Sequence, residues 1–153
     1  VVVIVILGVL ASIAAPKFFD VKGEARKSEM KTLSSSINKS IEVVYSKAML
    51  ENKVSSPFNT VFIAGEDIQI TLGYPYITPD NIRRMLPQMS PTIQSEGTDP
   101  ILFYPSDNNL KLVKNVSKTN LPEGCYVAVF DQRSSVKGII PPVAKLPDNM
   151  NCQ

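Results

Sequence analysis

The chain begins with fifteen residues that carry no charge, VVVIVILGVLASIAA, and Pro16 and Lys17 follow directly. Ten of the fifteen are Val, Ile or Leu, and burying each such side chain contributes roughly 1.5–3 kcal/mol. Leaving all of them in water would forgo roughly 15–30 kcal/mol, whereas a whole domain is typically stable by only about 5–15 kcal/mol. The run must therefore be buried in lipid, in a core or against copies of itself.

The run is shorter than the roughly 20 apolar residues that a membrane-spanning helix needs. No Met or basic residue precedes Val1, so we expect the run to be the end of a longer apolar segment. Two other interpretations stay open. A cleaved signal peptide has a similar apolar region, and the small residues 11–15 resemble its cleavage site. A buried core helix is the ordinary interpretation of an apolar stretch of this length. We favour membrane or self-assembly burial, because the helical pattern continues past Pro16 without a polar break.

Beyond Pro16, apolar residues recur every three or four positions, which places them on one face of a helix. They are Met30, Leu33, Ile37, Ile41, Val44 and Ala48. We expect this helix to persist to about Asn52 and to end at residues 54–57, whose sequence VSSP contains a helix breaker. A helix of about 50 residues is a rod of roughly 75–80 Å, and half of it would project bare and apolar.

Gly8 and Pro16 are the weak points of this rod. In a helix interior Gly costs about 1 kcal/mol relative to Ala and Pro costs about 3 kcal/mol, and Pro also removes a backbone hydrogen bond and kinks the helix. We expect local melting between the two residues wherever the freed backbone groups find other partners.

After Pro57, short runs rich in β-branched and aromatic residues alternate with turn signals, as in an antiparallel sheet. Residues 73–75 (GYP) are expected to form a turn, and a short helix should run from about residue 81 to 89, with Thr78 as N-cap and Pro79 at its first position. The strands are expected at 59–64, 67–72, 101–104, 110–113 and 125–130, with a hairpin loop at 105–109.

This order predicts an α+β fold. Residues 1–53 form the long helix, of which 1–16 are the membrane or filament-core segment and 17–53 are amphipathic. Residues 54–153 form a β-rich head that packs on the amphipathic half of the helix.

Cys125 and Cys152 are the only cysteines, and the chain has no His. Two cysteines do not make a structural zinc site, which needs four ligands. In an exported protein such a pair indicates a disulfide, which would tie the C-terminal tail to the strand around Cys125. Closing that loop contributes about 3–4 kcal/mol in the chain-entropy model. Two unpaired buried thiols remain the alternative.

The sequence offers no catalytic constellation. The absence of His removes the commonest general base and the usual triad, and the seven glycines form no phosphate-binding loop. Asn38 and Asn115 match the glycosylation pattern. The net charge of +2 gives no argument for nucleic acid, and we interpret the basic residues of the C-terminal part as a solvated face. We expect no enzyme, no cofactor, no metal site and no DNA partner.

The opening run with Pro16, Lys17 and Phe18 resembles the N-terminal helix of type IV pilins, just downstream of their prepilin-peptidase cleavage motif. Residues 24–28 (EARKS), 44–48 (VYSKA) and 73–75 (GYP), together with the cysteine pair, are similar in particular to mannose-sensitive haemagglutinin pilins of marine gammaproteobacteria.

The resemblance implies a subunit that waits in the bacterial inner membrane and is then assembled by pilus machinery into an extracellular filament of identical copies for surface attachment, with a surface or glycan receptor as a further partner. It also implies that the stretch from Gly8 to Pro16 loses helicity in the filament. The family carries a Phe and then a Glu at its processed terminus, and this chain starts after both positions. The residues expected in membrane or filament core are Val1, Val2, Val3, Ile4, Val5, Ile6, Leu7, Val9, Leu10 and Ile13.

Two other functions stay open. A pseudopilin of a type II secretion system would share the fold, although the major pseudopilins usually lack a C-terminal disulfide loop. A membrane-anchored binding or enzyme domain would carry a pocket with convergent polar groups.

Overall fold

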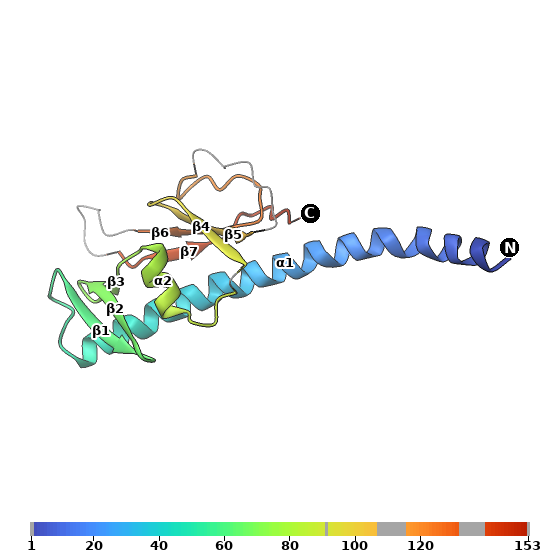
Figure 1. The fold of residues 1–153 in the computed structure, drawn as a ribbon. Coiled ribbons are helices and arrows are strands. Elements are labelled where there is room, and N and C mark those ends of the chain that lie inside the picture. Colours follow the sequence, from blue (N-terminus) through green and yellow to red (C-terminus); the bar gives the residue numbers. More distant parts are fainter. Residues whose placement is uncertain (1, 91, 107–115, 132–139, 153) are drawn as a thin grey trace.

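The computed structural model describes the backbone of residues 2–90, 92–106, 116–131 and 140–152, and the side chains of these residues apart from 2 and 4–20. A single helix, α1 (Val2–Leu50), extends along the whole molecule, and the sheets cover only its C-terminal part (Figure 1). The expected long helix and antiparallel β-structure are both present. The β-structure forms two sheets, where the sequence had suggested one.

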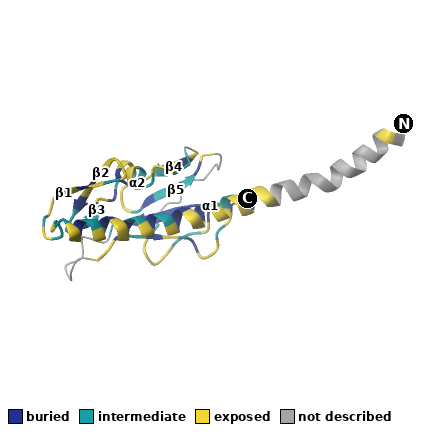
Figure 2. Ribbon diagram, turned by 90° about the horizontal axis from the view of Figure 1, so that it is seen from below, coloured by how far each residue is buried: buried dark blue, intermediate teal, exposed yellow. Residues whose placement is uncertain are grey.

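Helix α1 buries the apolar face that its sequence predicts. Six residues of that face are at most 6% exposed: Met30, Leu33, Ile37, Ile41, Val44 and Ala48. In Figure 2 the side of α1 that faces the sheets is buried, and the opposite side is exposed. The helix contacts strands β1, β3, β6 and β7 and helix α2, so one helix face serves as the inner wall for both sheets.

Helix α1 ends in a hydrogen-bonded cap two residues before the expected end. Asn52 has a left-handed backbone with φ 56°, and its N–H donates to the Met49 carbonyl. The Lys53 N–H donates to the Ala48 carbonyl at 2.8 Å. These two bonds form a Schellman motif, which Asn accepts because its side chain tolerates this conformation.

The first sheet consists of β1 (Asn59–Ile63), β2 (Glu66–Thr71) and β3 (Tyr74–Pro75), antiparallel and in that order. Two-residue turns join the strands, and both residues of each turn have positive φ, as the right-handed twist of a hairpin requires. Gly73 is needed in the second turn, since its φ is +86° and a Cβ there would lie 3.0 Å from the Tyr45 ring. The expected turn at 73–75 thus falls one residue earlier, and its last two residues form β3.

Helix α2 (Pro79–Met85) begins as predicted. The Thr78 hydroxyl accepts a hydrogen bond from the Asn81 N–H, and Pro79 occupies the first turn. The prediction of an end near residue 89 was wrong. Pro87 disfavours helical backbone at the preceding residue, and Leu86 leaves the helix with φ −127° and ψ 69°.

The second sheet has the order β4-β5-β6-β7, all antiparallel. Its strands are β4 (Ile93–Glu96), β5 (Ile101–Pro105), β6 (Val127–Phe130) and β7 (Val143–Lys145). Strands β5 and β6 match the predictions at 101–104 and 125–130, whereas β4 and β7 were not predicted. The strand expected at 110–113 and most of the hairpin loop expected at 105–109 lie outside the described residues.

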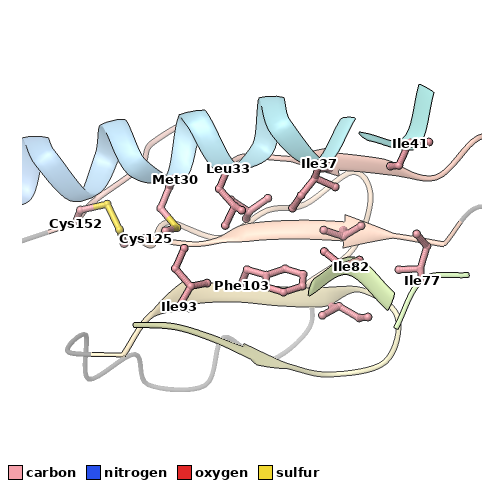
Figure 3. Packing of buried hydrophobic residues seen from close by; sticks show 14 residues of the cluster. Met30, Leu33, Ile37, Ile41, Ile77, Ile82, Ile93, Phe103, Cys125 and Cys152 are labelled. Carbon is pink, nitrogen blue, oxygen red and sulfur yellow. A yellow bond between two sulfur atoms is a disulfide. The ribbon is translucent and has the colours of Figure 1, made fainter. Parts of the chain in front are cut away.

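Buried side chains form three clusters. The largest joins α1, α2 and the second sheet, and Figure 3 shows side chains of α1 pointing toward Phe103, Ile93 and Ile82. A second cluster joins the C-terminal part of α1 to the first sheet. The third lies around Tyr126, Ala128 and Phe130. All four residues of β6 are buried, since alternate side chains enter different clusters.

At the outer edge of the first sheet, side chains form hydrogen bonds with backbone groups of the edge strand. On edge strand β1, the Thr60 carbonyl accepts a hydrogen bond from Lys53 Nζ at 2.7 Å, and the Thr60 N–H donates to the Asn59 side chain at 2.9 Å. Both backbone groups of Thr60 are therefore satisfied within the chain, at an edge that would otherwise be open to another strand.

Candidate functional site

The N-terminal part of α1 projects beyond both sheets (Figure 1). Nine of the ten residues expected to be buried in membrane or filament core lie in this projection, and Val1 lies outside the described residues. Val3, the one whose side chain is described, is 67% exposed; the side chains of the other nine lie outside the described residues. Their burial in lipid or in a filament therefore stays a prediction. Within the part of the chain that was placed, no helix is both long enough and apolar enough for a membrane span.

Gly8 and Pro16 both lie within α1, and the backbone is helical at each. Melting between them was expected wherever the freed backbone groups find other partners, and in the filament in particular, and it stays a prediction. The helical backbone does fix one feature of this stretch. Proline has no N–H, so the Ser12 carbonyl, four residues earlier, has no helical donor at position 16.

A groove of about 660 Å³ lies between α1 and the segment that links α2 to β4; we call it the α1–α2 groove. The α1 wall carries small and hydroxyl side chains, and the other wall is mainly apolar. The lining residues are Ala25, Ser28, Glu29, Thr32, Leu33 and Ser36 of α1, with Met85, Leu86, Pro87, Gln88, Met89, Ser90 and Ile93 opposite.

Two shallower hollows extend this groove along the exposed side of α1. The first, of about 590 Å³, shares Ser36 and Leu86 with the α1–α2 groove. The second, of about 360 Å³, shares Lys39 and Glu42 with the first. The α1–α2 groove and the two hollows together follow α1 from residue 25 to residue 50.

The Asn38 side chain joins α1 to edge strand β7. Its amide donates to the Ala144 carbonyl at 3.0 Å and its oxygen accepts from the Ala144 N–H at 2.8 Å; the Ser34 hydroxyl donates to the same carbonyl at 3.4 Å. This contact was not predicted. The only sequence signal was a polar residue one position from the apolar stripe. The same amide nitrogen belongs to a glycosylation pattern, but here it is engaged with the protein backbone.

Cys125 and Cys152 form the expected disulfide, with a Cα–Cα distance of 4.7 Å. Both residues are at most 3% exposed. Arg26 Nη1 donates to the Cys152 carbonyl at 3.3 Å, so the end of the chain is also held against α1. The C-terminal tail is thus fixed at Cys152 by the disulfide and at Ala144 by Asn38.

A further hollow of about 490 Å³ lies on the outer face of the first sheet. It is lined by Phe58, Asn59, Thr60, Gln69, Ile70 and Tyr76. Phe58 is 75% exposed and Tyr76 is 37% exposed, so two aromatic side chains flank polar ones there.

The described residues contain no group of three or more Cys, Asp or Glu side chains placed to hold a metal ion. The acidic pair Glu66 and Asp67 is part of the β1–β2 hairpin. From the sequence we expected no catalytic residues and no cofactor, and both expectations stay predictions.

Comparison with known proteins identified no matching family model, no similar curated protein and no similar solved structure.

Proposed function

We propose that this chain is a structural subunit of an extracellular helical filament of the type IV pilus kind, serving surface attachment. The observation that carries the proposal is the division of α1 into two parts. Residues 21–50 bury one face against the sheets of their own chain, whereas residues 2–15, which are uncharged, lie on the part of α1 that extends beyond those sheets.

This division fits a subunit that is completed by its neighbours. An apolar helix without cover in its own chain is covered either by lipid or by other copies, and head-to-tail packing of identical rods generates an open filament. The proposal places the subunit in the bacterial inner membrane before assembly and in a homopolymer afterwards. The disulfide-bound tail supports the pilin over the pseudopilin within the resemblance described above.

Electron microscopy of material sheared from the cell surface tests the proposal. We expect filaments roughly 60–80 Å wide, because a core of helices, each about 10 Å across, would be wrapped by small sheet domains. Mass spectrometry of the purified filaments should identify this chain. Cells that make the protein abundantly but carry no such filaments would refute the proposal.

A membrane-anchored binding domain is the second candidate. The hollow between Phe58 and Tyr76 favours it, because exposed aromatic side chains beside amide and hydroxyl groups are typical of ligand sites. This function requires monomers that keep their ligand affinity in detergent, whereas the filament function requires polymers. Gel filtration of the detergent-extracted protein, followed by electron microscopy, separates the two.

A further inference from the structure

The α1–α2 groove combines one mainly apolar wall with a row of hydroxyl groups on the other wall. Ser28, Thr32 and Ser36 lie four residues apart, so they follow one line along α1. Met85, Leu86 and Met89 contribute apolar surface opposite, and methionine side chains adapt to irregular partners. Among the described lining residues, Glu29 alone carries a charge. Such a groove suits an uncharged segment that still needs hydrogen-bond donors.

The chain itself contains a segment of this kind. Residues 8–15 are uncharged and largely small or aliphatic, and Pro16 deprives the Ser12 carbonyl of its helical donor. A carbonyl without a donor is costly in an apolar environment. Neighbouring Ser and Thr side chains are a known means of satisfying the groups that Gly and Pro free in apolar helices.

The segment cannot occupy the groove of its own chain, because residues 8–16 and the groove wall lie on the same continuous helix. We propose that the α1–α2 groove receives residues 8–16 of a second copy, and that a hydroxyl of the groove wall donates to the Ser12 carbonyl of that copy. This proposal rests on the filament function, to which it adds the receiving surface.

The lengths of segment and groove agree. The α1 wall from Ala25 to Ser36 spans about 17 Å, and residues 8–16 span about 13 Å as the helix of the single subunit. Partial melting in the filament would lengthen this segment toward the length of the wall. Placing Ser12 of one copy beside Thr32 of the next, with the helices parallel, offsets the copies by twenty residues, or about 30 Å along the helix. The small side chains at Ser28 and Ser36 allow the close approach that this contact needs.

Cysteine cross-linking tests the contact directly. Both native cysteines are paired, so an introduced pair reports on its own. Filaments of the full chain with Ser12→Cys and Thr32→Cys should give a ladder of covalent multimers on mild oxidation, visible on a non-reducing gel. The matched control replaces Lys31, an exposed α1 residue outside the groove lining, and Ser12→Cys with Lys31→Cys should give only monomers.

The outcomes separate this inference from the proposed function. Filaments that form normally but give no Ser12–Thr32 ladder would overturn the inference and leave the filament function intact. Failure of the unaltered chain to form filaments would overturn the function itself. Dimers from Thr32→Cys alone would assign the groove to a symmetric contact between heads, and that result also contradicts the inference.

A second variant tests the hydroxyl. Thr32→Val keeps the side-chain shape but removes the donor, so filaments should dissociate in detergent several-fold faster than those of the unaltered chain. Because Thr32 is exposed in the single subunit, the melting temperature of the monomer should stay unchanged. Ser35→Ala, an exposed hydroxyl outside this groove, is the control and should leave filament dissociation unaffected. Equal dissociation rates for all three proteins would show that the hydroxyl is not used.

Discussion

Asn38 and Asn81 each use their side-chain amide to bond both the N–H and the carbonyl of one strand residue. Asn38 bonds the N–H and carbonyl of Ala144, and Asn81 bonds the N–H and carbonyl of Gln69. Asn81 is 3% exposed and also donates to the Tyr76 carbonyl at 2.9 Å. Each amide takes the place of a peptide group in a neighbouring strand, and each joins a helix to a sheet.

We expect Asn81→Ala to lower the free energy of unfolding by about 2–3 kcal/mol, because it removes three hydrogen bonds of a buried side chain, among them the acceptor of the part-buried Gln69 N–H. Urea denaturation followed by circular dichroism measures the change. Asn59→Ala is the matched control. It removes one exposed local bond to Thr60 and should change stability by less than about 0.5 kcal/mol. Similar losses for both variants would contradict the role assigned to Asn81.

The buried hydroxyl of Tyr126 should make the free energy of unfolding depend on pH in the alkaline range. Burial raises the pKa of this hydroxyl from 10.0 to about 12, and the hydroxyl donates to the Pro122 carbonyl at 2.7 Å. The unfolded chain ionises first as pH rises, so this contribution to stability is complete below pH 10 and is lost between pH 10 and about 12. Tyr126→Phe should reduce that fall in urea denaturation measured across this range. An unchanged alkaline profile in the variant would contradict the assignment.

Helix α1 is the element whose sequence and structure agree most closely. Its apolar residues recur at helical spacing, and this pattern determines which face is buried regardless of which sheet covers it. Its C-terminus follows from local chemistry, since Asn52 adopts the left-handed conformation that closes the last turn. Lys53 and Lys47 also pair with Glu51 there and lower the pKa of its carboxyl group.

The cap predicts opposite effects for two substitutions at Asn52. Asn52→Gly should leave stability unchanged or slightly raised, because glycine adopts positive φ without steric cost. Asn52→Ala should cost about 1 kcal/mol, since the left-handed conformation is unfavourable for a residue with an ordinary side chain. Thermal unfolding of the two variants measures the difference. An alanine variant as stable as the glycine variant would contradict the Schellman assignment.

Most elements could be predicted from their own periodicity, but their pairing could not. Strands β1, β2 and β5 have alternating burial patterns that a local sequence shows. Strand β7 has only three residues, VAK, and is identified by its contacts with β6 and Asn38. The split into two sheets is likewise set by tertiary contacts. The α1–α2 groove was not predicted either, because its two walls are far apart in sequence.

The disulfide fixes the tail that contains β7. Replacing both cysteines, Cys125→Ala with Cys152→Ala, should lower the free energy of unfolding by about 3–4 kcal/mol through the freedom gained by the unfolded chain. Cleavage by trypsin after Lys145 should become faster. Limited proteolysis with mass spectrometry measures this, and a cleavage rate equal to that of the unaltered protein would contradict a tail held by the disulfide.

The whole molecule consists of a sheet-covered half and a projecting helical half. Among the residues whose side chains are described, those of α1 that join the core clusters lie at Met30 and beyond. Under the proposed function, the head folds within one copy, and the projecting segment is buried only in lipid or against further copies. Substitutions in residues 1–15 should therefore affect assembly and leave the head folded.

Val5→Asp tests this separation. A carboxylate within a filament core would be buried without a partner, so we expect filaments to be lost while the head keeps its fold. Val5→Leu, which keeps an apolar side chain of similar size, should assemble normally. Electron microscopy scores the filaments, and normal filaments from Val5→Asp would mean that this residue lies outside the core.

The side chains that hydrogen-bond the edge strands affect how copies of this chain behave when they are crowded together at high local concentration. Exposed edge strands readily pair with other chains, and such pairing leads to amyloid-like aggregation. Lys53 and Asn59 occupy the backbone groups of Thr60 on β1, and Asn38 and Ser34 occupy those of Ala144 on β7. At these two positions another copy would find no free backbone hydrogen-bonding group, and strand pairing between crowded copies is therefore disfavoured there.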